Sequence, residues 1–436
     1  MAKYILIGLG AVGRSFLRLV KETNSIPMDE VYCIDGDEKA QEYFTFVNGD
    51  TNHFIRQNVL ENNFRNLLEN LDADDYVFDF GMNIKNLDIL QYCIQKGSHY
   101  LSLSDSNWDV EDPEWISLHQ HYVEYVKIKK KTPRRSATSI IGFGMNPGLV
   151  SCMVKRCLEE IIENDCGEYI SQNRFKLRKL VEKGKFNVLS RKLGVEYVVE
   201  VDNDNQRFDV EVKTDKTIMS TWAPSAFLFE SIAPPEIVFG TRRLFYRYKE
   251  VRDCDFKDYY VSLKKPGIDC KETVFSPQGM IEGSLLPHEE VFTICNSLRH
   301  HRYKPTVCFV YSACDEAVRS VMNCREEEAL NFHLLTKKEY VSGGESVGVI
   351  VQGKKFHARY YGNYLDSNML SETATILQVS ASAFAAFQYM RDNPNEGVLF
   401  PDDLDHKTVF RTVAPFLGEF LSVECPEVCL NLGIEL

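Results

Sequence analysis

An apolar segment that runs directly into a glycine-rich turn opens this chain. Tyr4-Ile5-Leu6-Ile7 is followed by GLGAVG, in which Gly8, Gly10 and Gly13 have the spacing G-x-G-x-x-G. In this motif the first glycine makes a tight turn, the second lets the backbone approach a pyrophosphate, and the third lets a helix pack on a strand. The apolar period that begins at Phe16 predicts that helix, with the diphosphate at its N-terminus.

A second predicted strand, Val31-Tyr32-Cys33-Ile34, ends at Asp35. An acidic residue at this place holds the ribose diol of a dinucleotide, and its charge would repel a 2′-phosphate. The sequence therefore favours NAD over NADP as the cofactor. The predicted cofactor-binding residues are Gly8, Gly10, Ala11, Val12, Gly13 and Asp35.

Strand-like and helix-like segments alternate beyond this motif. Strands are expected near 53–55 and over 76–80, 99–103 and 138–143, and helices around 64–71 and 87–94. This alternation predicts an α/β chain that begins with a Rossmann-type, doubly wound parallel sheet. Many short β-like runs after Lys176 predict a second, α+β substrate domain on a mostly antiparallel sheet. The expected boundaries are 1–146 for the NAD-binding Rossmann domain, 147–366 for the α+β domain, and 367–436 for a helical C-terminal segment that returns to the Rossmann domain.

Composition limits the classes of protein. The 436 residues carry a net charge of −13, which disfavours nucleic-acid binding and suits a cationic substrate. There is no leader pattern and no apolar run long enough to span a bilayer, so we expect a cytoplasmic protein without membrane contact. The thirteen cysteines include no Cys-x-x-Cys pair, which argues against a zinc site, and we expect no bound metal.

Ligands of an open α/β sheet collect where its strands end. By that position Asn83, the pair Asp105 and Ser106, and Asn146 are candidates. The turn Asn146-Pro147-Gly148 could present its amide toward the nicotinamide, although a simple turn into a helix explains it about equally well.

Two clusters in the second half are candidates for binding an organic cation. Thr221-Trp222 is followed by Glu230, and a tryptophan ring beside carboxylates can hold an ammonium group. His288-Glu289-Glu290 offers a proton carrier near neutral pH. A packed tryptophan with surface acids, and a solvated loop histidine, are the simpler explanations of the same residues.

Several of these residues lie in longer motifs that resemble the bacterial-type, NAD-dependent homospermidine synthases, relatives of saccharopine dehydrogenase. The motifs are GFGMNPGLVS (142–151), STWAPSAFLFESIAPPE (220–236), LPHEE (286–290), YKPTVCFVY (303–311), YYGNYL (360–365), LQVSASA (377–383) and NPNEGVLFPDDLD (393–405). The resemblance implies an aminoalkyl transferase that uses bound NAD to oxidise a diamine such as putrescine to an imine. A second amine then displaces ammonia, and the stored hydride reduces the new imine. It also implies a homodimer.

The resemblance assigns roles by position. Trp222 would supply a ring face for the cation, Glu230 would hold the reacting amine, and Asn146 would orient the substrate. His288 and Glu290 match the family's histidine and glutamate, and Asp202 stands where the family typically has a glutamate.

Two positions depart from the family pattern. The family usually has a glutamate where this chain has Ser106, next to Asp105, and an aspartate where it has Asn83. Either Asp105 substitutes, or the outer substrate is not a simple diamine. Two other readings therefore stay open: a saccharopine or carboxynorspermidine dehydrogenase-type imine oxidoreductase, and a catalytically silent NAD-binding protein.

Overall fold

The computed structural model describes residues 2–108, 117–211, 216–241, 251–255, 260–325, 327 and 330–430. The chain divides into two compact units, each made of several segments. The first unit contains Met1–Ile116, Gln120–Leu149 and Ile376–Leu417. The second unit contains Ser117–His119, Val150–Thr375 and Gly418–Leu436.

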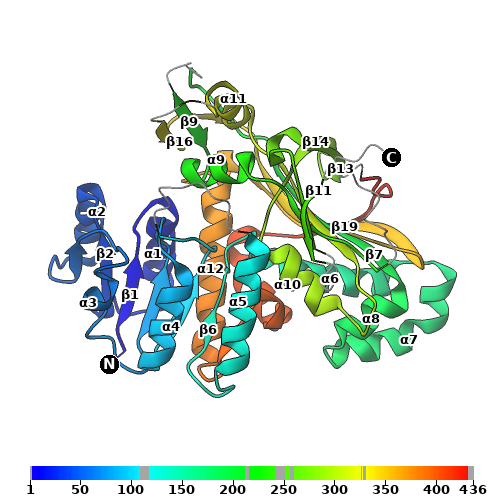
Figure 1. The fold of residues 1–436 in the computed structure, drawn as a ribbon, viewed down its shortest axis with the longest axis horizontal. Coiled ribbons are helices and arrows are strands. Elements are labelled where there is room, and N and C mark those ends of the chain that lie inside the picture. The colour runs from blue at the N-terminus through cyan, green and yellow to red at the C-terminus, as the bar shows by residue number, and fades with distance from the viewer. Residues whose placement is uncertain are drawn as a thin grey trace. The chain divides into compact units, whose positions relative to one another are not determined.

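A seven-stranded sheet forms the centre of the first unit (Figure 1). Its strands are β1 (Tyr4–Ile7), β2 (Val31–Asp35), β3 (Phe54–Arg56), β4 (Tyr76–Asp79), β5 (His99–Ser102), β6 (Ser139–Ile140) and β20 (Val398–Leu399). They are ordered β20-β6-β5-β4-β1-β2-β3, and every pair is parallel. Strands β1 to β6 thus have the order of a dinucleotide-binding sheet, which confirms the predicted Rossmann-type fold.

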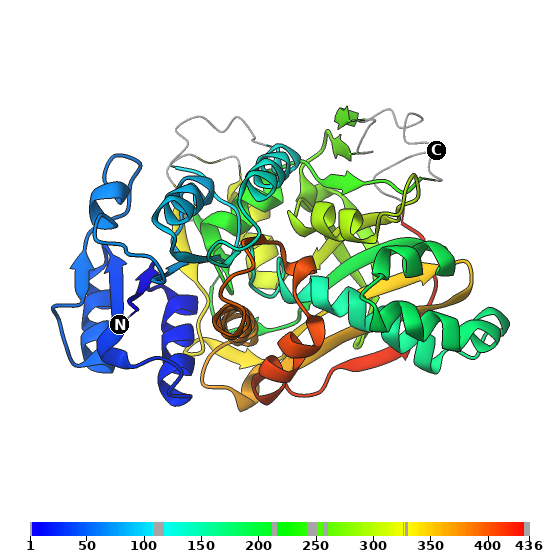
Figure 2. The same ribbon diagram turned by 90° about the horizontal axis from the view of Figure 1, so that it is seen from below.

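Helices cover both faces of this sheet. They are α1 (Ala11–Glu22), α2 (Glu38–Asn48), α3 (Phe64–Leu67), α4 (Asn86–Lys96), α5 (Leu118–Lys131), α12 (Ala374–Asp392) and α13 (His406–Leu417). Leu90 of α4 and Tyr125 of α5 share a buried apolar cluster with Val77 of the sheet. On the other side, Phe387 of α12 packs edge-on against Phe78, with ring centroids 5.3 Å apart. Figure 2 shows α4 and α5 on one side of the strands and α12 on the other.

The helix expected over residues 64–71 is shorter than predicted, because α3 ends at Leu67. Beyond it the chain turns toward β4. The backbone N–H of Asp72 donates to Asp75 Oδ2 at 2.9 Å, and this side-chain acceptor offers the backbone an alternative to the helix.

A ten-stranded mixed sheet forms the second unit. Its strands are β7 (Val195–Asp204), β10 (Glu236–Val238), β11 (Val251–Asp255), β12 (Tyr260–Leu263), β13 (Lys271–Ser276), β14 (Gly279–Leu286), β15 (Thr306–Ser312), β18 (Gly344–Gly353), β19 (Phe356–Asp366) and β21 (Leu421–Glu424). Only β15 and β7 pair in parallel among these strands. The remaining elements are α6 (Leu149–Asn164), α7 (Glu168–Glu182), α8 (Phe186–Leu193), α9 (Pro224–Ile232), α10 (Glu290–Leu298), α11 (Asp315–Cys324), and the short strands β8 (Arg207–Phe208), β9 (Thr217–Ser220), β16 (Asn331–Leu334) and β17 (Tyr340–Ser342).

The central strand β7 has two chemically different faces. Its sequence VEYVVEVDND alternates, and successive side chains of a strand point to opposite sides. Tyr197, Val199 and Val201 join the apolar core of the unit. Glu200, Asp202 and Asp204 lie on the other face and are buried as well. Within the described part of the chain, no helix is long and apolar enough to cross a membrane.

Candidate functional site

Of the three glycines in the loop after β1, only Gly10 has room for a side chain. A Cβ on Gly8, whose φ is +84°, would come within 2.8 Å of the carbonyl oxygen of Phe80, and a Cβ on Gly13 within 2.5 Å of that of Gly8. Gly10 has an ordinary φ of −71°, and nothing lies within 4 Å of a Cβ added to it. Side chains are excluded at Gly8 and Gly13 by the protein itself, whereas at Gly10 the free space allows a ligand to reach the backbone.

The first turn of α1 can bind an anion. Gly10 is the N-cap residue and makes no side-chain cap, and the first turn contains no acidic residue. The N–H groups of such a turn have no partner in the helix, and they carry the positive end of its dipole. Together with the open space at Gly10, this is the arrangement that holds a dinucleotide pyrophosphate.

Asp35 at the end of β2 is tied to the same loop. Its Oδ2 accepts the backbone N–H of Leu9 at 2.6 Å, and its Oδ1 accepts that of Asp37 at 2.8 Å. These two bonds fix the carboxylate beside the glycine loop, where the ribose of a dinucleotide lies in this fold.

A row of carboxyl groups lines one face of the sheet in the second unit. Glu200, Asp202 and Asp204 follow each other along β7 at every second residue. Glu345 of β18 lies directly opposite Asp204 and hydrogen bonds to Asp202. Tyr311 of β15 lies opposite Asp202 on the other side. Four acidic side chains therefore share one buried face.

Burial and mutual repulsion raise the pKa values of two carboxyl groups in this row, Asp204 and Glu345. Burial raises the pKa of Asp204 to about 6, although hydrogen bonds from Gln206 and Thr221 oppose the shift. Burial and the neighbouring Asp202 and Asp204 raise the pKa of Glu345 well above its usual range. A cation entering this face would favour the ionised forms.

Glu230, His288 and Glu290 form a coupled group beside that face. His288 Nδ1 hydrogen bonds to Glu290 Oε2, and both side chains are buried. Burial opposes charge on the ring, but Glu290, Glu230 and Glu289 raise the pKa of His288 to about 10. His288 in turn lowers the pKa of Glu290 despite its burial. The pair is therefore ionised at neutral pH.

The pKa of Glu230 in α9 is raised, whereas that of Glu290 is lowered. Desolvation and the negative charges of Glu289, Glu290 and Asp202 raise its pKa to about 8, against the opposing charge of His288. A half-buried carboxyl group that titrates near pH 8 can exchange a proton with an amine.

An aromatic series links Trp222 to this group. Trp222 packs edge-on against Phe227 at 6.5 Å, and Phe227 packs edge-on against Tyr311 at 6.0 Å. Phe309 continues the series, with its ring centroid 4.4 Å from that of His288. The second unit thus brings four residues singled out from the sequence close enough to influence one another's charge: Asp202, Glu230, His288 and Glu290. Trp222 lies in the same unit and is connected to His288 through Phe227, Tyr311 and Phe309.

The other predicted site residues lie in the first unit. Asn83 is exposed in the loop after β4, with a φ of +57°, and Asn146 is half-buried in the turn after β6. Asp105 is held from inside the unit: Tyr125 Oη donates to it at 2.8 Å, and His121 Nδ1 hydrogen bonds to its other oxygen. The hydroxyl of Ser106 donates to the carbonyl oxygen of Ile84 at 2.5 Å.

Sequence reasoning missed Glu200, Asp204 and Glu345. The alternation E-x-D-x-D in β7 was a usable signal for the first two, since period-two spacing places them on the face of Asp202. Glu345 could not be placed in this way, because it reaches the row through pairing with a strand far away in the sequence.

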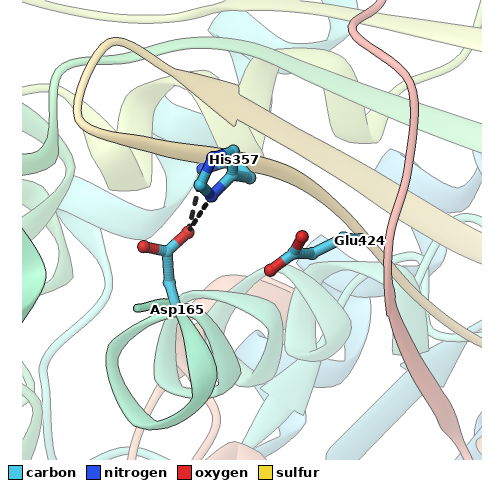
Figure 3. A group of neighbouring side chains, drawn as sticks. All are labelled: Asp165, His357 and Glu424. Carbon is cyan, nitrogen blue, oxygen red and sulfur yellow. Dashed lines mark hydrogen bonds and ion pairs between the residues drawn. The ribbon is translucent and has the colours of Figure 1, made fainter. Parts of the chain in front are cut away.

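Among the described residues, two groups of side chains have a composition that could bind a metal: His288 with Glu289 and Glu290, and Asp165 with His357 and Glu424, the latter drawn in Figure 3. In the second group, Asp165 accepts the backbone N–H groups of Gly167 at 2.7 Å and His357 at 2.9 Å, as well as the ring of His357 at 3.1 Å. Glu424 pairs with Arg359 at 3.5 Å. These bonds explain the second group as a structural contact that holds the turn between α6 and α7 against β19.

Comparisons with known proteins agree with this description. Residues 4–140 match the family model of the saccharopine dehydrogenase NADP binding domain, a nucleotide-binding domain. Over nearly its whole length the chain is similar to homospermidine synthases. It is 25% identical to that of Blastochloris viridis over 445 residues, 96% of this chain and 90% of the relative. It is 23% identical to that of Mesorhizobium japonicum over 439 residues, 95% of this chain and 88% of the relative.

A solved structure shows the same fold. The homospermidine synthase of Legionella pneumophila, determined in complex with NAD, superposes with a TM-score of 0.81 at 22% identity. The match covers 97% of this chain and 91% of that one. The resemblance to homospermidine synthases that the sequence motifs indicate is thus confirmed.

Proposed function

We propose that this protein is a homospermidine synthase-like enzyme that joins two amines and releases ammonia. Two molecules of putrescine would give one homospermidine and one ammonia. The observation that carries the proposal is the group of Asp202, Glu230, His288 and Glu290, connected to Trp222 by a series of packed rings, because it combines negative charge, a proton carrier and an aromatic ring. A diammonium substrate needs all three.

NAD is the proposed cofactor, held by the glycine loop and Asp35. The open space at Gly10 and the uncapped first turn of α1, with Ala11 and Val12, fit a pyrophosphate. The carboxylate of Asp35 fits a ribose diol and would repel a 2′-phosphate. When bound, NAD would accept a hydride from an amine carbon and return it.

The residues of the second unit would bind and deprotonate the amine. We assign the inner ammonium to the ring of Trp222 and to Glu230, and the far end of that substrate to Asp202. Ionised Glu230 would take a proton from the reacting amine, since its pKa of about 8 lies much closer to that of an alkylammonium group than an ordinary carboxyl pKa does. His288, protonated at neutral pH and held at Nδ1 by Glu290, would donate a proton through Nε2. Asn146 would orient the substrate.

Asn83, Asp105 and Ser106 remain the proposed outer amine site. Asp105 already receives hydrogen bonds from Tyr125 and His121, and its neighbour Ser106 is bound to the backbone. A second ammonium would therefore find less uncompensated charge here than beside a free glutamate. We also propose a cytoplasmic homodimer that acts on small amines.

The open space at Gly10 gives a specific prediction. Gly10→Ala should fold like the parent, because its φ is allowed for alanine and the new Cβ contacts no protein atom. It should bind NAD at least tenfold more weakly, as measured by calorimetry, because one lost close contact of about 1.4 kcal/mol gives that factor. NADP should bind weakly to both proteins. Unchanged NAD affinity in Gly10→Ala would place the pyrophosphate elsewhere.

The proposed reaction is tested with putrescine and an amount of NAD far below that of the amine. We expect homospermidine by mass spectrometry, one ammonia for each product molecule, and no net NADH absorbance. One NADH for each amine consumed would indicate an ordinary dehydrogenase instead. Absence of both product and NADH would indicate a silent NAD-binding protein.

A further inference from the structure

Asp204, at the end of β7, is the centre of a buried hydrogen-bond network. Its Oδ2 accepts the hydroxyl of Thr221 at 2.8 Å. Its Oδ1 accepts both the backbone N–H of Gln206 at 3.0 Å and the side-chain amide of Gln206 at 2.9 Å. Asp204 is 2% exposed and Thr221 is fully buried, so these bonds form away from water. Such bonds to a carboxylate are stronger than bonds between neutral groups.

The network continues to the beginning of α12. Gln206 Oε1 accepts the hydroxyl of Ser367 at 2.5 Å and the backbone N–H of Ala374 at 3.2 Å. Gln206 Nε2 also donates to the hydroxyl of Thr375 at 3.2 Å. The position of Asp204 is therefore fixed both by β7, which pairs with β15 and β18, and by residues far along the chain.

Thr221 is the residue directly before Trp222, in the turn between β9 and α9. Trp222 is half-buried and packs on one side against Phe227. Its backbone N–H reaches Ser220 Oγ only at 3.4 Å, so the stronger anchor of this turn is the Thr221 hydroxyl. A ring that is partly exposed depends on its backbone for its orientation.

We infer that Asp204 is a positioning residue: through Thr221 it fixes the turn from which Trp222 presents its ring to the amine. This inference rests on the proposed function of Trp222 as a cation-binding ring. It adds a residue that does not touch the substrate. It also explains why an ionisable group is buried beside Thr221, since a carboxylate can accept all three donors at once.

Two replacements of Thr221 distinguish the effect of its hydroxyl from the effect of its size. The chain has three tryptophans, so Trp108→Phe with Trp115→Phe leaves Trp222 as the single fluorescent reporter. In this background Thr221→Val keeps the size but removes the donor, and Thr221→Ser keeps the donor. We expect Thr221→Val to increase acrylamide quenching of Trp222 and to weaken putrescine binding about tenfold, part of the ~30-fold that loss of the whole cation–π contact would cost. Thr221→Ser should restore both properties, and KM should change more than kcat.

Asp204→Asn is the second variant, used if Thr221→Val does not fold. It retains the size but faces three donors with one acceptor oxygen, so it should change Trp222 quenching and putrescine affinity in the same direction. Unchanged quenching in either variant, or equal losses in Thr221→Val and Thr221→Ser, would overturn the inference. Quenching reports the ring without any ligand. A failure of putrescine to bind the parent would contradict the proposed function. The quenching measurements would still decide whether Asp204 positions Trp222.

Discussion

Glu230→Gln should lower kcat about 100-fold, the contribution typical of a general base. The substitution keeps the size of the side chain and removes the group that would take a proton from the reacting amine. Burial and the charges of Glu289, Glu290 and Asp202 raise the pKa of Glu230 to about 8. The carboxyl group is therefore protonated below that pH and ionised above it.

The pH profile shows whether this carboxyl group is the base. In the parent protein, kcat/KM should rise as the pH increases through about 8, because Glu230 then becomes able to accept a proton. This limb of the profile should be missing in Glu230→Gln, whereas the titration of the amine itself should be common to both. Glu282→Gln, on an exposed position of β14, is the matched control and should behave as the parent does. An identical acidic limb in parent and Glu230→Gln would assign the base to another residue.

Trp222→Ala should weaken putrescine binding about 30-fold, which corresponds to a cation–π contact of about 2 kcal/mol. The ring lies at the end of the series Phe227, Tyr311 and Phe309 that leads to His288. Loss of this ring should therefore lower the affinity for putrescine more than the stability of the protein. Calorimetric titration with putrescine measures the change.

Two further variants control this result. Trp222→Phe should recover part of the affinity, because phenylalanine keeps an aromatic face. Trp108→Phe removes a tryptophan of the first unit that donates to Asp88 at 2.8 Å, and it should leave putrescine affinity unchanged. Equal affinity in Trp222→Ala and the parent would remove Trp222 from the binding site.

The fold of the first unit could be predicted because its signals are local. The strand, the glycine loop and the terminal Asp35 are contiguous, and the alternation of elements continues to β6. The short α3 was not foreseen, since Asp75 bonds the backbone of Asp72 in a turn that competes with the helix. β20 joins the same sheet beside β6 through pairing that no local pattern specifies.

The candidate site could be predicted only in part. Trp222, Glu230 and His288 were found from motifs, and all three lie in the second unit. The motifs could not show how the side chains influence one another's charge, because the raised pKa of Glu230 depends on its burial and on Asp202, Glu289 and Glu290 together. Glu345 joins the carboxyl row through β18, and the register of a distant strand is fixed by long-range packing.

The most direct test of the account uses an equal mixture of unlabelled putrescine and putrescine with ¹⁵N at both ends. Joining two diamines with loss of one nitrogen from the donor gives homospermidine with three nitrogens. Donor and acceptor are each labelled half of the time, so products with zero, one, two and three ¹⁵N atoms should form in about equal amounts, with catalytic NAD and one ammonia for each product. Products that contain nitrogen from only one diamine, or NADH equal to the amine consumed, would contradict the proposal that this protein joins two amines.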